Sequence, residues 1–276
     1  MQKITIRDIQ KFKDQRTPFA TVTAYDYVSA RIADAVGIPL LLVGDSAAMV
    51  VYGMDTTIPI SMEEMIFLVR AVCRGSNKSL VVADMPFMSY QASVEDAVRS
   101  AGRFVKEGGA EAVKLEGGRA YTAQIKAIID AGIPVMGHIG LLPQSYHLSS
   151  GYRIQGKTKL EAEKILTDAM AVQNSGAFAV VLEGIPANLA EKITLKLDIP
   201  TIGIGAGPYC DGQIQVYHDI IGLYEGMIPR HCKRYGDLGH QIQNMLTEYK
   251  EDVETIKFPA QEHYTTSQIL SEENHK

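Results

Sequence analysis

Cysteine is scarce in this chain and too scattered to organise a fold. The three cysteines, Cys73, Cys210 and Cys232, lie far apart and form no CxxC pair. Disulfide scaffolds and zinc knuckles need several closely spaced cysteines, so the spacing favours neither class. We expect the thiols to stay reduced, as they do in a reducing compartment.

Long apolar runs and an excess of basic residues are also missing. No segment is long and apolar enough for a membrane span, and residues 1–16 alternate charged and apolar side chains, unlike a signal peptide. The net charge is −5 and the pI is about 5.8, so no basic face for nucleic acid is indicated. These absences predict a cytoplasmic protein that binds neither membrane nor nucleic acid.

What is present is a regular alternation of two kinds of segment. The 276 residues are 46% hydrophobic and 21% charged, which suffices for a large core. The expected strands are 19–26, 38–46, 79–87, 110–118, 133–140, 177–183, 199–207 and 212–218. The expected helices are 1–16, 27–36, 61–74, 93–107, 119–131, 158–175, 186–197 and 235–257.

This alternation predicts an α/β protein with a parallel sheet, because strands apolar on both faces need helices on both sides. No GxGxxG follows the first strand, which disfavours a dinucleotide-binding doubly wound sheet. We therefore predict a single-domain (β/α)8 TIM barrel over residues 1–257, with an open doubly wound sheet as the alternative. Residues 258–276 are polar, and we expect a flexible tail. The long segment 141–157 is expected to be a functional loop.

Polar residues interrupt the expected strands at their carboxyl ends, where (β/α)8 barrels place their active sites. They are Tyr25, Asp26, Asp45, Ser46, Asp84, Lys114, Glu116, His138 and Glu183. Lys114 and Glu116 are two positions apart on one strand, so their side chains face the same way. Alone, this pair fits a surface ion pair equally well. Polar residues at the same end of six successive strands favour an active site.

The residue types indicate a metal site. Asp45, Asp84 and Glu116 would repel one another if they converged without compensation. A hard divalent cation resolves the repulsion, and ligation by oxygen atoms alone suits Mg²⁺. The alternative interpretation is that one or two of these carboxylates cap a following helix.

Three other side chains complete the expected chemistry. Lys114 would offer a fixed positive charge to a carboxylate or enolate oxygen. Glu183 ends an otherwise apolar strand and is our candidate for general acid or base, the alternative being a charge at a helix N-terminus. His138 would hydrogen-bond the substrate or act as a base, although a lone histidine is more often structural. The glycine-rich segment 203–207 is a weak sign of a phosphate loop.

The motifs around these residues resemble those of one family, the ketopantoate (3-methyl-2-oxobutanoate) hydroxymethyltransferases. The matching pieces run in order from about residue 19 to 222. They include Thr23-Ala24-Tyr25-Asp26, Gly44-Asp45-Ser46, Ala83-Asp84-Met85-Pro86-Phe87, Val113-Lys114-Leu115-Glu116-Gly117-Gly118, Gly137-His138-Ile139-Gly140 and Val181-Leu182-Glu183. The chain departs from the family pattern at Met88 and Ser150, where glycine is expected, and at Ala47-Ala48.

The resemblance implies an activity and its participants. A hydroxymethyl group would pass from 5,10-methylenetetrahydrofolate to 3-methyl-2-oxobutanoate, giving 2-dehydropantoate for pantothenate synthesis. It implies one Mg²⁺ per subunit on Asp45, Asp84 and Glu116, and keto-acid contacts from Asp45, Ser46, Asp84 and Lys114. Glu183 would be the proton acceptor. The subunits would form a homodecamer of two pentameric rings.

Two other functions stay open on the residues alone. One is a Mg²⁺-dependent carbon–carbon lyase or phosphonomutase on a related barrel. The chain lacks the cysteine followed by Gly-His that the isocitrate lyases would show. The other is a catalytically silent barrel used for binding, against which Lys114, Glu116 and Glu183 argue.

Overall fold

Eight parallel strands close into a barrel in the computed structural model, which describes residues 3–224, 226 and 228–267. The strands are β1 Phe19–Thr23, β2 Leu40–Val43, β3 Leu80–Asp84, β4 Ala112–Glu116, β5 Val135–Gly140, β6 Ala179–Glu183, β7 Thr201–Ile204 and β8 Gly212–Gln215. They pair in sequence order, and β1 pairs with β8 to close the barrel. The predicted (β/α)8 barrel is confirmed, and the open sheet is excluded.

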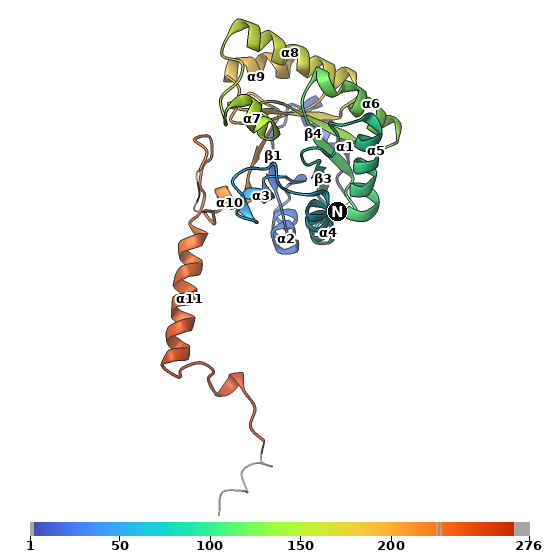
Figure 1. Cartoon of the computed structure of the whole chain (residues 1–276). Helices are drawn as coiled ribbons and strands as arrows, with labels where there is room; N and C mark the ends of the chain where they lie inside the picture. Colours follow the sequence, from blue (N-terminus) through green and yellow to red (C-terminus); the bar gives the residue numbers. More distant parts are fainter. Residues whose placement is uncertain (1–2, 225, 227, 268–276) are drawn as a thin grey trace, which may run out of the picture.

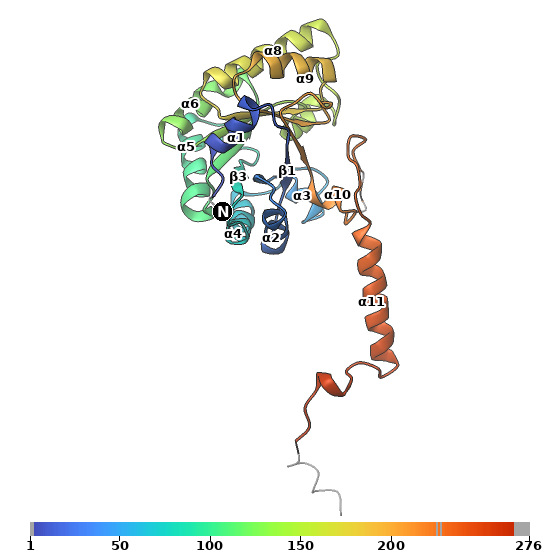
Figure 2. The same cartoon turned by 180° about the vertical axis from the view of Figure 1, so that it is seen from behind.

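Helices cover the outside of the barrel (Figures 1 and 2). The long ones are α2 Tyr27–Ala35, α4 Met62–Gly75, α5 Val94–Arg103, α6 Thr122–Asp130, α8 Lys159–Asn174 and α9 Ala187–Lys196. Serine side chains cap two of these helices at their N-termini: the Ser61 hydroxyl accepts from Glu64 N, and the Ser93 hydroxyl accepts from Asp96 N. Short helical turns that were not predicted are α3 Ala47–Val50, η3 Pro143–Ser145, α7 Tyr146–Ser149 and α10 Tyr217–Ile220. The turns η1 Phe104–Gly108 and η2 Arg119–Tyr121 fall on the expected helices 93–107 and 119–131.

The amino end of the barrel is sealed by the first helix, α1 Ile6–Asp14. Ile9 is fully buried in a cluster with the first residues of several strands, among them Phe19, Leu40 and Leu80. Lys13 fixes the helix by an ion pair with Asp211 at 3.0 Å. With apolar side chains filling this end, the polar side chains of the strands gather at the carboxyl end.

Several predicted strands end earlier than expected, among them β1 and β8. In both of these a side-chain oxygen accepts a hydrogen bond from a backbone N–H group just beyond the strand. Asp26 accepts from Val28 N and Ser29 N, which ends β1 and starts α2. The eighth strand was predicted to reach residue 218, but it ends at Gln215. There the hydroxyl of Thr23 accepts from Tyr217 N, and the chain turns into α10.

Two departures from the family pattern lie at strained backbone positions. Met88 has φ 66° and Ser150 has φ 52°, which is the left-handed region that favours glycine. A side chain in this region costs roughly 1–2 kcal/mol. The expectation of glycine at both positions therefore has a conformational basis.

The last long helix, α11 Leu238–Glu254, stands away from the barrel (Figures 1 and 2). None of its described residues is buried. The tail predicted at 258–276 is described only to residue 267 and includes the turn η4 Gln261–His263; residues 268–276 lie outside the described part. The domain boundary at 257 and the flexibility of the tail stay predictions. No helix within the described residues is long and apolar enough to cross a membrane.

Candidate active site

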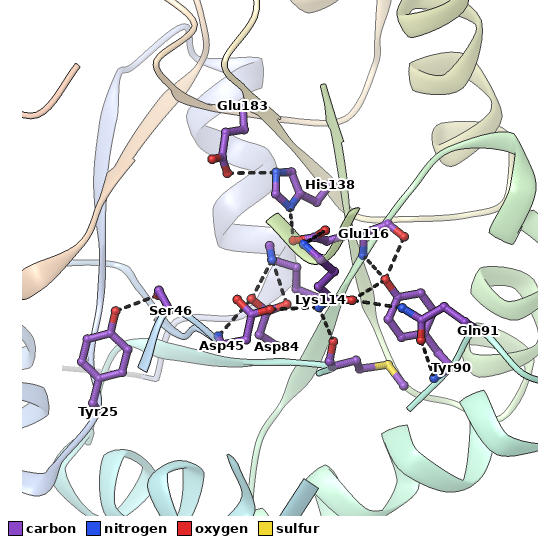
Figure 3. A network of polar contacts seen from close by, with 12 residues as sticks. Tyr25, Asp45, Ser46, Asp84, Tyr90, Gln91, Lys114, Glu116, His138 and Glu183 are labelled. Carbon is purple, nitrogen blue, oxygen red and sulfur yellow. Dashed lines mark hydrogen bonds and ion pairs between the residues drawn. The ribbon is translucent and has the colours of Figure 1, made fainter. Parts of the chain in front are cut away.

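Strand register places the predicted polar residues next to one another at the carboxyl end of the barrel (Figure 3). Asp84 on β3 pairs with Lys114 on β4, and Glu116 on β4 pairs with His138 on β5. Asp45 lies two residues after the end of β2, and Glu183 is the last residue of β6. Because neighbouring parallel strands end at the same level, charges distant in sequence become neighbours. All of these residues except Glu183 are at most 4% exposed.

Lys114 and Asp84 form the most tightly paired charges of the site. Lys114 Nζ donates to both carboxylate oxygens of Asp84, each at 2.7 Å. Burial disfavours the charged lysine, but the negative charges of Asp84, Glu116 and Asp45 outweigh burial and raise the pKa of Lys114 above its usual value. The surrounding carboxylates therefore favour the charged form of this buried lysine.

Negative charge exceeds positive charge around this lysine. Burial first, and then Asp84 and Glu116, raise the pKa of Asp45 well above its usual range. Oε1 of Glu116 is buried, accepts no hydrogen bond among the described residues, and lies 3.5 Å from Nδ1 of His138. Buried carboxylate oxygens without a donor are costly unless a cation joins them. The donor set of Asp45, Asp84 and Glu116 therefore fits a hard divalent cation in charge and in ligand type.

The side chains are not arranged around a common point. Within the described residues, no three His, Cys, Asp or Glu side chains stand in a geometry ready to hold a metal ion. Both oxygens of Asp84 are taken by Lys114, and one of them also accepts from Asp45 N at 3.3 Å. The assignment of a metal to these carboxylates stays a prediction.

His138 lies between two carboxylates. Its Nε2 is 3.1 Å from Glu183 Oε2, and its Nδ1 is 3.5 Å from Glu116 Oε1. Burial and Lys114 disfavour the imidazolium, but Glu116 and Glu183 outweigh them and raise the pKa of His138 to about 9. The side chain of Glu183 is 17% exposed, so it is more accessible than the rest of the cluster.

Ser46 and Tyr25 lie beside this cluster (Figure 3). Tyr25 Oη and Ser46 Oγ are hydrogen-bonded at 2.8 Å, and Ser46 is half-buried. Asp26, which the sequence grouped with the site, instead caps α2. The sequence pattern could not separate the two possibilities, since a carboxylate at a strand end also precedes a helix.

Two neutral residues of the site were missed, Tyr90 and Gln144. Tyr90 Oη accepts from Glu116 N at 3.1 Å and lies 3.0 Å from Glu116 O. Gln144 donates to Asp45 and Glu116. Both residues lie in loops rather than at strand ends, and neither is charged. The one signal available was the length of the segment 141–157, which contains Gln144.

Comparisons of sequence agree on one family. The model of a family described as ketopantoate hydroxymethyltransferase matches residues 3–261. A 3-methyl-2-oxobutanoate hydroxymethyltransferase of Carboxydothermus hydrogenoformans is 52% identical over 266 residues, covering 96% of each chain. The protein of the same name from Geobacter metallireducens is 53% identical over 262 residues, covering 95% of this chain and 98% of the relative.

Comparisons of structure show where this barrel belongs among known folds. A phosphonopyruvate hydrolase in complex with oxalate and Mg²⁺ has a TM-score of 0.59 at 13% identity, covering 95% of this chain and 93% of the other. A 2,3-dimethylmalate lyase, a member of the PEP mutase/isocitrate lyase superfamily, has a TM-score of 0.58 at 17% identity, covering 96% and 92%. At these identities the likeness shows the fold alone, a barrel like those of that superfamily.

Proposed function

Because the chain belongs to the ketopantoate hydroxymethyltransferase family and has this activity in pantothenate biosynthesis, we propose that the cluster around Lys114 is its catalytic site. The observation that carries this proposal is a buried lysine paired to one carboxylate and surrounded by two more. The lyase and phosphonomutase alternatives share only the fold at 13–17% identity. The catalytically silent barrel is excluded as well, because the chain has hydroxymethyltransferase activity.

The substrate is a 2-oxo acid, whose carboxylate and keto oxygen both need positive charge or hydrogen-bond donors. Lys114 offsets the negative charge that develops when the keto acid becomes an enolate. Asp45, Asp84 and Glu116 would hold Mg²⁺, which when bound polarises the carbonyl group and acidifies the neighbouring C–H bond. Ser46 would contact the keto acid from the half-buried edge of the site.

Glu183 is the proposed acceptor of the C3 proton. Breaking the C3–H bond leaves its electron pair in the enolate, and C3 then attacks the methylene carbon of 5,10-methylenetetrahydrofolate, the proposed donor. One C–N bond of the methylene bridge breaks as the C–C bond forms, and the released nitrogen takes up the proton removed from C3. Water then displaces the second nitrogen: its oxygen becomes the hydroxyl group, its proton goes to that nitrogen, and tetrahydrofolate leaves. His138, 3.1 Å from Glu183, orients this carboxylate. The loop 141–157 covers the site and excludes water.

Metal removal is expected to stop enolisation. With Mg²⁺ present, the C3 proton of 3-methyl-2-oxobutanoate should exchange with solvent in D₂O, observed by NMR. With EDTA the rate should fall at least about a hundredfold, because the metal supplies several kcal/mol of charge stabilisation. Excess Mg²⁺ added after EDTA is the control and should restore the rate. Equal exchange with and without EDTA would remove the metal from the proposal, and no exchange under either condition would remove enolisation at this site.

We also propose that the chain forms a homo-oligomer, with a decamer as the expected state. The support from this structure is α11, whose residues Met245, Leu246, Tyr249 and Val253 lie on one face and are 44–61% exposed. The start of α11 is joined to the barrel, where Leu238 N and Gly239 N donate to the carbonyl oxygens of Ile221 and Gly222, but none of its 17 residues is buried. Most helical stability in proteins comes from packing of an apolar face, so this face needs a cover. A second copy of the chain is the proposed cover.

The double substitution Leu246→Glu/Tyr249→Glu should therefore lower the molar mass measured by light scattering after gel filtration. Two buried charges at such an interface would cost several kcal/mol per copy. The control is Asn244→Glu/Thr247→Glu, which adds the same charges to the opposite face of α11 and should leave the mass unchanged. An unchanged mass for the first variant would show that this face is not an interface.

A further inference from the structure

Gln144 uses every hydrogen-bonding atom of its side chain within the site. Nε2 donates to Asp45 Oδ2 at 3.0 Å and to the carbonyl oxygen of Met85 at 2.9 Å. Oε1 accepts from Gln91 Nε2 at 3.0 Å and lies 3.0 Å from Tyr90 Oη. The residue is 5% exposed. A buried amide with all partners in place is held in one orientation.

The backbone of Gln144 makes a further contact that the side chain does not control. Its N–H donates to Glu116 Oε2 at 3.0 Å. Gln144 thus contacts one group at the carboxyl end of each of β2, β3 and β4, although it lies in the segment after β5. These are Asp45, Met85 and Glu116 (Figure 3 shows the two carboxylates).

The direction of the amide follows from its neighbours. Asp45 and the Met85 carbonyl are both acceptors, so the NH₂ group must face them. A flipped amide would place its oxygen against two other oxygens and leave Gln91 Nε2 facing a second donor. The loop 141–157 is held near this point by Leu141 N, which donates to Glu183 O at 2.8 Å.

We propose that Gln144 is a positioning residue of this enzyme: its side chain holds the carboxylate of Asp45 in the orientation needed for the divalent cation and the keto acid. By the same bonds it fixes the start of the loop 141–157, whose backbone N–H at residue 144 holds the carboxylate of Glu116. The inference rests on the proposed function of these carboxylates. Partners that orient metal-binding groups commonly change metal affinity or activity by about 10–100-fold when they are removed.

A neutral amide suits this task better than a charged donor. A second lysine or an arginine at position 144 would also bind Asp45, but it would neutralise the charge that attracts the cation. The amide of Gln144 orients Asp45 without adding a positive charge of its own. Lys114, paired with Asp84, already provides a positive charge in the site.

The test compares the same chemical change at two glutamines of one loop. Gln144→Glu turns a donor into an oxygen that faces Asp45 and the Met85 carbonyl. Gln155→Glu is the matched control, because the amide of Gln155 donates only to the carbonyl oxygen of Arg153 among the bonds described. Gln144→Met is a second variant that removes the bonds without adding a charge, in case the first does not fold.

Two quantities are measured on the whole protein: the affinity for Mg²⁺ without substrate, by calorimetry, and the rate of C3–H exchange of the keto acid. Both Gln144 variants should bind Mg²⁺ about 10–100-fold more weakly and exchange more slowly by a similar factor, with a smaller change in the KM of the keto acid. Gln155→Glu should match the parent. Unfolding midpoints identify variants that fail by misfolding.

The result that would overturn the proposal is a folded Gln144→Met protein within twofold of the parent in both quantities. If the parent itself bound no Mg²⁺, the proposed metal site would fail. The exchange rates would still test the role of Gln144 separately from the metal. A rate that falls in Gln144→Met but not in Gln155→Glu requires that Gln144 orients the reacting groups.

Discussion

Lys114→Met should abolish hydroxymethyl transfer and destabilise the barrel by about 3–5 kcal/mol, the usual cost of removing one partner of a buried ion pair. Lys114 Nζ is the donor to both oxygens of Asp84, and the two side chains are 5% and 2% exposed. Without the lysine, Asp84 is an uncompensated buried charge beside Asp45 and Glu116. Methionine fills a similar volume, so the loss reports charge rather than a cavity.

Adding Asp84→Asn to Lys114→Met separates stability from activity. With both charges gone, much of the lost unfolding free energy should return, since no unpaired buried ion remains. Activity should not return, because the cation proposed to contact the keto acid is still absent. Lys126→Met, at an exposed pair with Asp130, is the control and should change stability by less than about 0.5 kcal/mol. A Lys114→Met protein with parental activity would show that Lys114 does not face the substrate.

The barrel could be predicted from the sequence because its signals are local. Each apolar strand and each amphipathic helix is encoded within its own segment, and strand order follows once the sheet is closed. The period of two along β4 placed Lys114 and Glu116 on one face, and the structure has them together. The end of β8 was predicted too late because it depends on Thr23, nearly two hundred residues away.

The neutral part of the site could not be predicted for a related reason. Charged residues in apolar strands stand out in a sequence, whereas a tyrosine and a glutamine in loops do not. Tyr90 and Gln144 meet at 3.0 Å only because the loops after β3 and β5 converge over Glu116. The direction of α11 is likewise not encoded in its own amphipathic pattern, which indicates an apolar face but not what covers it.

Glu183→Gln should lower the rate of C3–H exchange by about 10²–10⁴-fold and change the KM of the keto acid little, as expected for the loss of a general base. The amide keeps the shape of the side chain but cannot accept the proton. His138 is the competing acceptor. Its raised pKa, about 9, keeps it protonated at neutral pH, and an imidazolium has no lone pair to receive a proton. The raised pKa of His138 therefore favours the proposed assignment, with Glu183 as acceptor and His138 as the group that orients it.

The comparison with His138→Asn decides between them. If Glu183 accepts the proton, His138→Asn should keep a reduced but measurable exchange rate, while Glu183→Gln falls toward the rate without enzyme. If His138 is the acceptor, the order of the two variants reverses. Glu191→Gln is the control, because Glu191 lies exposed on α9, and it should exchange at the parental rate. The 3.1 Å separation of His138 Nε2 and Glu183 Oε2 makes some loss in both variants unavoidable, so the ranking of the rates is the informative result.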